Sequence, residues 1–271
     1  MKSRLLVAAA GLPVMLAILC LLPPFATTIL FSLICVIGVF ELFRAVGLRE
    51  RRAAMALCML SACGVQAWVL LRGYGGAAVI LLPFTVLLFG IWVSYHERDL
   101  AFGMSGLGAA LFSGFLVPLG LAAMTALRKL PDGQLWVLAP LVATFLGDTG
   151  AYFVGRGLGK RKMAPRTSPK KTMAGLYGGL LFSAGFMVVY GLVLRAFGVY
   201  GSLWKLGLTG LIGGMVAQLG DLSFSVIKRQ FGVKDYGKLL PGHGGAYDRF
   251  DSTTFAAPAV LALLTLLGVI A

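Results

Sequence analysis

The sequence predicts an all-α, polytopic integral membrane protein with about nine transmembrane helices, and three observations favour this class. Hydrophobic residues make up 59% of the chain, charged residues make up 13%, and the mean hydropathy is +0.90. A soluble domain has roughly 45–50% apolar and about 25% charged residues. The charge-poor runs are long enough to cross a bilayer core of about 30 Å, which takes roughly 20 helical residues. The sequence lacks the alternating segments of about ten residues that a membrane barrel needs.

In chain order, the candidate spans are residues 4–22, 25–43, 53–71, 75–94, 105–127, 134–154, 175–197, 203–224 and 252–271. Residues 1–135 contain little besides these apolar runs, so we interpret them as scaffold. Residues 136–271 carry two polar segments, which lie between membrane helices. We expect the two parts to form one continuous membrane domain.

The basic residues predict the orientation, because short cytoplasmic loops carry the excess of Lys and Arg. With the N-terminus inside, 19 basic residues fall on the cytoplasmic side and 5 on the other. The 5 are Arg72, Arg128, Lys129, Arg195 and Lys205. We therefore expect a cell (inner) membrane protein whose two polar segments both face the cytoplasm. Such loops, attracted to anionic lipid, account for the net charge of +14, so no nucleic-acid partner is expected.

Two features of the apolar runs are interpreted as structural. Glu41 and Arg44 stand three residues apart at a cytoplasmic helix end, a spacing that favours an ion pair within the helix over a functional role. A stripe of small residues predicts close helix contact and permits a homodimer. Its members are Gly207, Gly210, Gly213, Gly214 and Ala217.

The first polar segment, residues 147–175, begins with an acidic residue in a predicted span. Asp148 there is costly enough to indicate a substrate-binding role, or else a structural pairing with Arg or Lys. Gly155, Gly157 and Gly159 predict a flexible basic loop that could bring backbone N–H groups to a phosphate. Ser168 and Pro169 then predict a helix start, with Lys170, Lys171 and Thr172 in the first turn as an anion site.

The second polar segment, residues 218–252, holds a polar helix face and three acidic residues. If the helix continues, Gln218, Asp221, Ser225 and Lys228 share one face. Asp248 and Asp251 share a face if the last helix starts near them. Asp221, Asp248 and Asp251 together would suit a hard cation such as Mg²⁺, although Asp251 could instead belong to a simple helix cap.

Between these carboxylates lies the turn Pro-Gly-His-Gly-Gly. Its glycines, including Gly244 and Gly245, permit a tight turn and the close approach of a ligand to the backbone. His243 could act as an acid, a base or a phosphate donor, or it could stabilise the turn.

The segment SVIKRQFGVKDYGKLLPGHGGAYDRFD, residues 225–251, resembles the signature of the phosphatidate cytidylyltransferases, the CDP-diacylglycerol synthases. GDTGAYFVGR and SPKKT, further upstream, are similar to other elements of that family in the same order. The resemblance implies that residues 136–271 are catalytic and convert CTP and phosphatidate to CDP-diacylglycerol and pyrophosphate. It implies Mg²⁺ as cofactor, with the three aspartates as its ligands. The implied site also contains Asp148, Ser168, Lys170, Lys171, Thr172, Ser225, Lys228, Arg229, Lys234, His243, Gly244, Gly245 and Arg249.

Two departures from the family pattern leave alternatives open. Ala174 stands close to where the family has an acidic residue, and Phe224 stands where it has Glu. A degenerate, non-catalytic paralogue would explain both losses. A CTP-dependent polyprenol or phytol kinase would share the helices and basic loops. A transporter would instead place paired charges near mid-membrane in repeated halves, which the sequence does not show.

Overall fold

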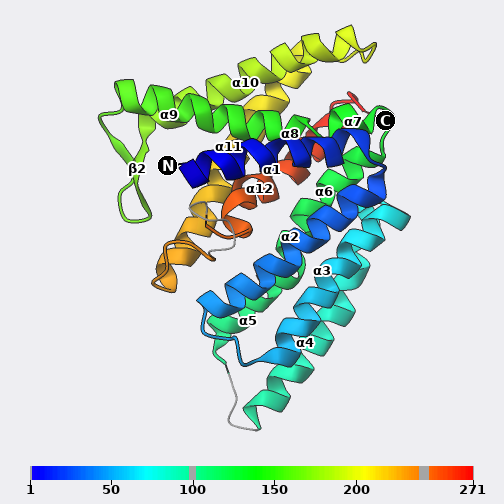
Figure 1. Cartoon of the computed structure of the whole chain (residues 1–271), viewed down its shortest axis with the longest axis vertical. Coiled ribbons are helices and arrows are strands. Elements are labelled where there is room, and N and C mark those ends of the chain that lie inside the picture. The colour runs from blue at the N-terminus through cyan, green and yellow to red at the C-terminus, as the bar shows by residue number, and fades with distance from the viewer. Residues whose placement is uncertain (1, 98–101, 238–243, 271) are drawn as a thin grey trace. The chain divides into compact units, whose positions relative to one another are not determined.

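The computed structural model describes residues 2–97, 102–237 and 244–270, and for residues 2–10 it describes the backbone alone. The described chain is mostly helical, with one short antiparallel pair of strands (Figure 1). The N-terminal elements are α1 (Lys2–Leu21), α2 (Pro24–Ala45), α3 (Arg52–Arg72), η1 (Tyr74–Ile80), α4 (Leu81–His96), α5 (Met104–Leu111), η2 (Phe112–Leu116) and α6 (Val117–Lys129). They are followed by α7 (Gly133–Trp136), α8 (Ala139–Leu141), η3 (Val142–Leu146), α9 (Gly147–Leu158), β1 (Lys162–Ala164), β2 (Ser168–Thr172), α10 (Met173–Ala196), α11 (Leu203–Gln230) and α12 (Tyr247–Leu266).

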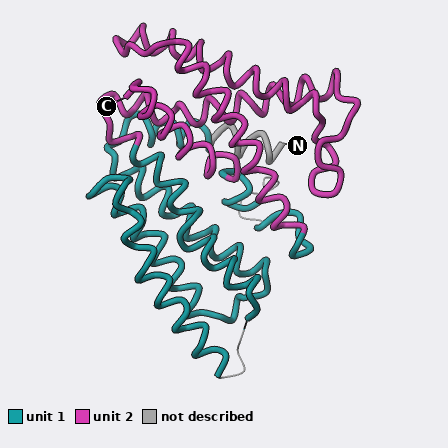
Figure 2. Tube along the Cα trace, turned by 180° about the vertical axis from the view of Figure 1, so that it is seen from behind, with its two compact units in different colours: residues 1–126, 230–250 teal, residues 127–229, 251–271 magenta. Residues whose placement is uncertain are grey.

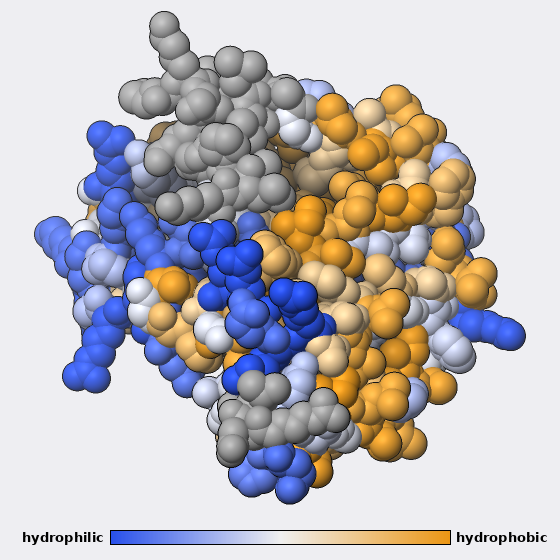
Figure 3. Space-filling model, turned by 60° about the horizontal axis from the view of Figure 1, so that its bottom comes forward, coloured by the Kyte–Doolittle hydropathy of each residue, from blue (hydrophilic) through white to orange (hydrophobic). Residues whose placement is uncertain are grey.

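Seven helical segments among the described residues are long and apolar enough to cross a membrane. Each overlaps one predicted span, so the all-α membrane class is confirmed. The helices α1 and α12, at the predicted spans 4–22 and 252–271, are not among the seven, and nine spans stays a prediction. The seven segments are Pro24–Ala45, Arg52–Arg72, Tyr74–His96, Met104–Lys129, Gly133–Leu158, Met173–Ala196 and Leu203–Gln230. Figure 3 shows one face of the molecule, on which hydrophilic side chains gather on one part and hydrophobic side chains on another.

The chain divides into two compact units (Figure 2). Unit 1 comprises residues 1–126 and 230–250, and unit 2 comprises residues 127–229 and 251–271. The segment 230–250, which follows the long helix α11, thus groups with the N-terminal helices. The predicted division at residue 135 lies near residue 126, where the chain first passes from unit 1 to unit 2. The prediction did not foresee that residues 230–250 group with the N-terminal helices.

Unit 1 is built on apolar contacts among α2 to α6. Phe43, Phe84 and Leu88 belong to its buried cluster. Gly114 gives room to the Phe84 ring, because a Cβ there would lie 2.5 Å from the ring edge. The buried Gln66 amide donates from Nε2 to the carbonyl of Pro118 at 3.0 Å, which satisfies a polar group inside the apolar core.

Unit 2 depends on close contact between helices at small residues. A Cβ on Gly178 would collide with Val154, so α9 and α10 approach closely there. Ser183 on α10 donates to the carbonyls of Ala143 at 2.9 Å and Gly210 at 2.6 Å. A Cβ on Gly210 would lie 2.5 Å from the Ser183 carbonyl oxygen. The packing role predicted for the small-residue stripe is confirmed at Gly210.

Two local predictions near the first polar segment are wrong. Ser168 and Pro169 lie in strand β2, which pairs with β1, and do not start a helix. The helix α10 begins at Met173, where the Thr172 hydroxyl caps it by accepting the N–H of Gly175 at 3.1 Å. The predicted flexible loop is also shorter, because α9 continues to Leu158.

Candidate functional site

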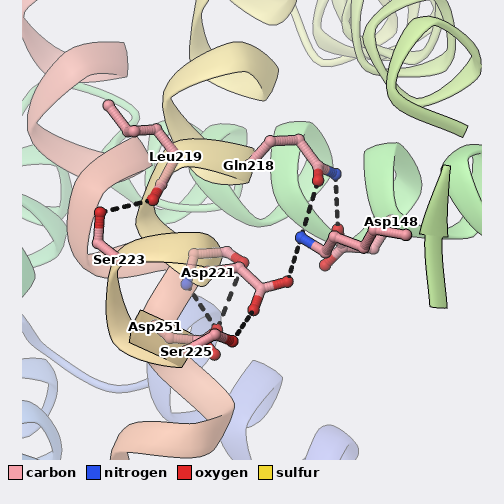
Figure 4. Close-up of polar contacts among 9 residues, drawn as sticks. Asp148, Gln218, Leu219, Asp221, Ser223, Ser225 and Asp251 are labelled. Atoms are coloured by element: carbon pink, nitrogen blue, oxygen red, sulfur yellow. Dashed lines mark hydrogen bonds and ion pairs between the residues drawn. The ribbon is translucent and has the colours of Figure 1, made fainter. Parts of the chain in front are cut away.

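A polar face on α11 forms one side of the candidate site in unit 2. The helix continues to Gln230, so it includes all of the predicted face of Gln218, Asp221, Ser225 and Lys228, and Figure 4 shows the first three of these side chains. Ser225 Oγ donates to Asp221 Oδ1 at 3.4 Å. Gln218 is buried, whereas Asp221 is half-buried. The carboxylate of Asp221 can therefore contact both protein groups and a ligand.

Lys171 on β2 connects this face to the rest of the site. Its Nζ lies 2.5 Å from Asp221 Oδ2 and donates to Gln218 Oε1 at 2.9 Å. Gln218 Nε2 in turn donates to Asp148 Oδ1 on α9 at 3.2 Å. Three elements thus contribute to one network of charged and amide groups. The Asp148 side chain, predicted to be functional or paired, is exposed and receives the Gln218 amide.

Asp251 belongs to the same cluster (Figure 4). It lies on α12, outside the seven segments that could cross a membrane, and its Oδ1 accepts the backbone N–H of Ser252 at 2.7 Å. Burial and, to a smaller extent, the charge of Asp221 raise the pKa of the Asp251 carboxyl group to about 7, against the opposing effects of the Ser252 N–H and Lys228. Because α12 begins at Tyr247, Asp251 is not a helix cap, and that alternative is wrong.

This pair of carboxylates has the chemistry of a magnesium site. Among the described residues, no three His, Cys, Asp or Glu side chains are grouped as ligands of one metal ion. Mg²⁺ commonly uses one or two carboxylates, with water and substrate phosphates completing its shell. Asp221 and Asp251 supply two carboxylates whose mutual repulsion a divalent cation would relieve. The residues therefore fit the ion.

Asp248, the third predicted ligand, belongs to unit 1 and holds the backbone there. It shares α12 with Asp251, as predicted. Its Oδ2 accepts the backbone N–H groups of Tyr236 and Gly245, both at 2.9 Å. A metal-binding role for Asp248 stays a prediction.

A cavity of about 450 Å³ opens beside Asp148 and Lys171 in unit 2. Arg156, Lys162, Lys170 and Lys171 line it, as does Tyr152. The Arg156 guanidinium donates to the Tyr152 hydroxyl at 2.9 Å. Four cations around one cavity favour a ligand with several negative charges.

Glycines allow the backbone segments that line this cavity to pack closely. A Cβ on Gly159 would collide with the Gly155 carbonyl and lie 2.5 Å from the Thr172 hydroxyl oxygen. The glycines predicted to bring backbone close to a phosphate thus shape the cavity from the end of α9. Lys162 and Tyr152 were not foreseen as lining residues, because Lys162 is placed by the pairing of two strands and Tyr152 lies within a predicted membrane span.

The remaining predicted residues are distributed over both units. In unit 2, Ser168 and Lys228 are half-buried, and Arg229 Nε donates to the carbonyl of Thr167 at 3.4 Å. In unit 1, Lys234 and Arg249 are exposed. Gly244 adopts a φ of +84°, which favours glycine, so the predicted tight turn is confirmed at this residue. His243 lies outside the described residues.

Known proteins resemble this chain over half to nearly all of its length. The family model of the Cytidylyltransferase family matches residues 2–267. A phosphatidate cytidylyltransferase of Pseudomonas aeruginosa is 34% identical over 270 residues, which are 99% of this chain and 98% of the relative. One from Staphylococcus epidermidis is 38% identical over 195 residues, 72% of this chain and 69% of the relative. One from Bacillus subtilis is 42% identical over 134 residues, 49% of each chain.

Proposed function

This chain belongs to the cytidylyltransferase family, and we propose that it is a phosphatidate cytidylyltransferase of phospholipid biosynthesis. It converts CTP and phosphatidate to CDP-diacylglycerol and pyrophosphate. The similarity to the Pseudomonas aeruginosa relative over nearly the full chain carries the proposal. The cavity lined by four cations fits substrates that both bear phosphates.

The reaction needs alignment and charge neutralisation more than it needs a protein nucleophile. A phosphate oxygen of phosphatidate attacks the α-phosphorus of CTP, the bond from that phosphorus to the bridging oxygen breaks, and pyrophosphate leaves. Lys171 and the other cations of the cavity neutralise the phosphates as they approach. Gln218 keeps Lys171 and Asp148 in fixed positions through its two amide hydrogen bonds.

We assign a magnesium ion to the carboxylates of Asp221 and Asp251, with Asp248 as the third predicted ligand. When bound, the ion supplies positive charge to the phosphates of the nucleotide. Phe224, which stands where the family has Glu, is fully buried and packs edge-on against Phe255, with 6.3 Å between the ring centroids. The fold therefore uses this position for apolar packing.

The membrane arrangement belongs to the same proposal. Nine spans, with the N-terminus and the active site at the cytoplasmic side of the cell membrane, agree with the basic residues, 19 of which lie in the loops assigned to that side. A site at the membrane surface suits one lipid substrate and one dissolved substrate. A homodimer of this enzyme belongs to the proposal too, but Gly210 and Gly214 of the small-residue stripe pack against α10 within the chain.

Product analysis with two labels tests the activity. Detergent-solubilised protein is given phosphatidate and CTP labelled either in the cytosine ring or at the γ-phosphate, with Mg²⁺ or with EDTA. We expect cytosine label in lipid with Mg²⁺ and no γ-label there. Transfer of γ-label alone would identify a lipid kinase instead. Asp221→Asn serves as the matched inactive variant, and no labelled lipid from folded wild type would disprove the proposal.

A further inference from the structure

Glu41 on α2 is a buried carboxylate that the proposed mechanism does not use. Its side chain is 5% exposed, and a buried carboxylate needs hydrogen-bond donors to offset its lost hydration. Glu41 Oε2 accepts the backbone N–H of Ala246 at 2.7 Å, from a residue 205 positions later in the chain. Arg44, the partner suggested by spacing, is exposed at the surface. The carboxylate of Glu41 thus points into unit 1, toward the segment that resembles the family signature.

Two glycines of that segment close on the same carboxyl group. A Cβ built on Gly237 or on Gly245 would collide with the carboxyl atoms of Glu41. These glycines stand on either side of residues 238–243, which lie outside the described residues. One carboxylate therefore contacts the backbone both before and after that part of the signature.

The same face of α2 also receives the start of α12. Cys35, Gly38 and Glu41 follow at intervals of three, so they lie along one side of the helix. A Cβ on Gly38 would collide with the ring of Tyr247, and the Tyr247 hydroxyl lies 3.4 Å from the Cys35 carbonyl oxygen, to which it donates. Helix α2 thus contacts the ring and hydroxyl of Tyr247 through Gly38 and Cys35, and it contacts the preceding backbone through Glu41.

Gly245 connects Glu41 to a predicted site residue. Its N–H donates to Asp248 Oδ2 at 2.9 Å, while its Cα side packs against Glu41. Asp248 also accepts the N–H of Tyr236. If the Glu41 carboxylate were removed, both Gly245 and Ala246 would lose a contact that fixes them, and the Asp248 carboxylate would lose its fixed donors.

We propose that Glu41 is a positioning residue for the cytidylyl transfer, which fixes the backbone of residues 244–248 and through it the Asp248 carboxylate. The inference rests on the proposed function, because it assigns Asp248 and its neighbours to that reaction. The sequence alone predicted that the N-terminal helices are scaffold, whereas this role would make one of them contribute to the reaction.

Three substitutions at residue 41 test this role. Glu41→Ala should lower kcat about 100-fold, as expected when reacting groups are slightly misplaced, and leave the KM for CTP within about threefold. Glu41→Gln keeps an oxygen that can accept the Ala246 N–H, so it should stay within about tenfold of wild type. Glu41→Asp draws the carboxylate back by one methylene and should fall between them. Glu50→Ala, at an exposed glutamate of the same unit, is the matched control and should behave as wild type.

Each rate is referred to the amount of folded protein, measured by gel filtration and thermal unfolding in detergent. If Glu41→Ala does not fold, the Asp and Gln variants give the comparison. Wild-type kcat in Glu41→Ala, a Gln variant as inactive as Ala, or losses that follow only the folded fraction would each overturn the positioning role. An inactive wild type would overturn the proposed function and this role together, whereas an active wild type with an unaffected Glu41→Ala would overturn this role alone.

Discussion

The burial of Asp251 in unit 2 should make the stability of the folded protein depend on pH. An aspartate in an unfolded chain has a pKa of about 3.9. In the folded protein, burial and the charge of Asp221 raise the pKa of Asp251 to about 7. Between these two pH values the folded state binds more protons than the unfolded state. The free energy of unfolding therefore falls as the pH rises from about 4 to about 7.

Replacing Asp251 with Asn should remove this cost. Asp251→Asn should unfold at a higher temperature than wild type at pH 8 in EDTA, by about 2 °C or more. The difference should shrink at pH 5, where Asp251 of wild type is protonated. At the same time the variant should lose Mg²⁺-dependent CDP-diacylglycerol formation. Thermal unfolding at the two pH values and the product assay measure these effects.

Asp132→Asn, at an exposed aspartate of the same unit, is the control and should change neither the unfolding temperature nor the activity. An Asp251→Asn protein that is less stable than wild type at pH 8 would show that the buried charge does not destabilise the fold.

At the level of elements, the strand conformation of β2 gives Lys170 and Lys171 different surroundings. A helix start would have placed Lys170 and Lys171 at neighbouring positions of one turn. In a strand, successive side chains point to opposite faces. Lys171 accordingly reaches Asp221 and Gln218 and is half-buried, whereas Lys170 is exposed at the cavity.

This difference predicts unequal effects of substitution. Lys171→Met should lower kcat/KM by about 100-fold or more, because it removes a preorganised cation from the phosphates and leaves Asp221 without its ion pair. Lys170→Met should cost about tenfold, mainly through KM, as for a more exposed charge. Initial rates at varied CTP concentration separate the two parameters.

Lys160→Met, at an exposed lysine that does not line the cavity, should stay near wild type. Equal losses at residues 170 and 171 would contradict the strand arrangement.

At the scale of the whole molecule, the helix α10 tests the membrane arrangement. It contains 24 residues, and at about 1.5 Å per residue such a helix is roughly 36 Å long, enough for a bilayer core. Arg161 lies before it, in the first polar segment, and Tyr200 lies after it. Both side chains are exposed. The proposed orientation places them on opposite sides of the membrane.

Cysteine labelling measures this directly. With a membrane-impermeant maleimide, Arg161→Cys should react only in inside-out vesicles and Tyr200→Cys only in intact cells. Wild type is the background control, since its Cys35 and Cys58 are buried and Cys20 and Cys63 are half-buried. Labelling of both variants from one side would mean that α10 does not cross. The reverse pattern would mean that the N-terminus faces outward.

The sequence by itself determined the helices and the family. Hydropathy over a run of residues and the 3.6-residue period are local properties, so seven predicted spans and the face of Gln218, Asp221 and Ser225 could be found without a structure. The motif around Asp248 and Asp251 indicated the chemistry for the same reason, because its residues are close in the chain.

Only the tertiary structure decided which distant groups meet. Lys171 contacts Gln218 across 47 positions, and Glu41 contacts Ala246 across 205. Such contacts depend on how closely helices pack at glycines such as Gly38 and Gly245, and no local pattern encodes that. Ser168 lies in a strand and not at a helix start because β2 pairs with β1, and this pairing could not be predicted from the local sequence. For these reasons the structure assigns Glu41 a place beside the signature, although its sequence spacing favoured an ion pair with Arg44 within the helix.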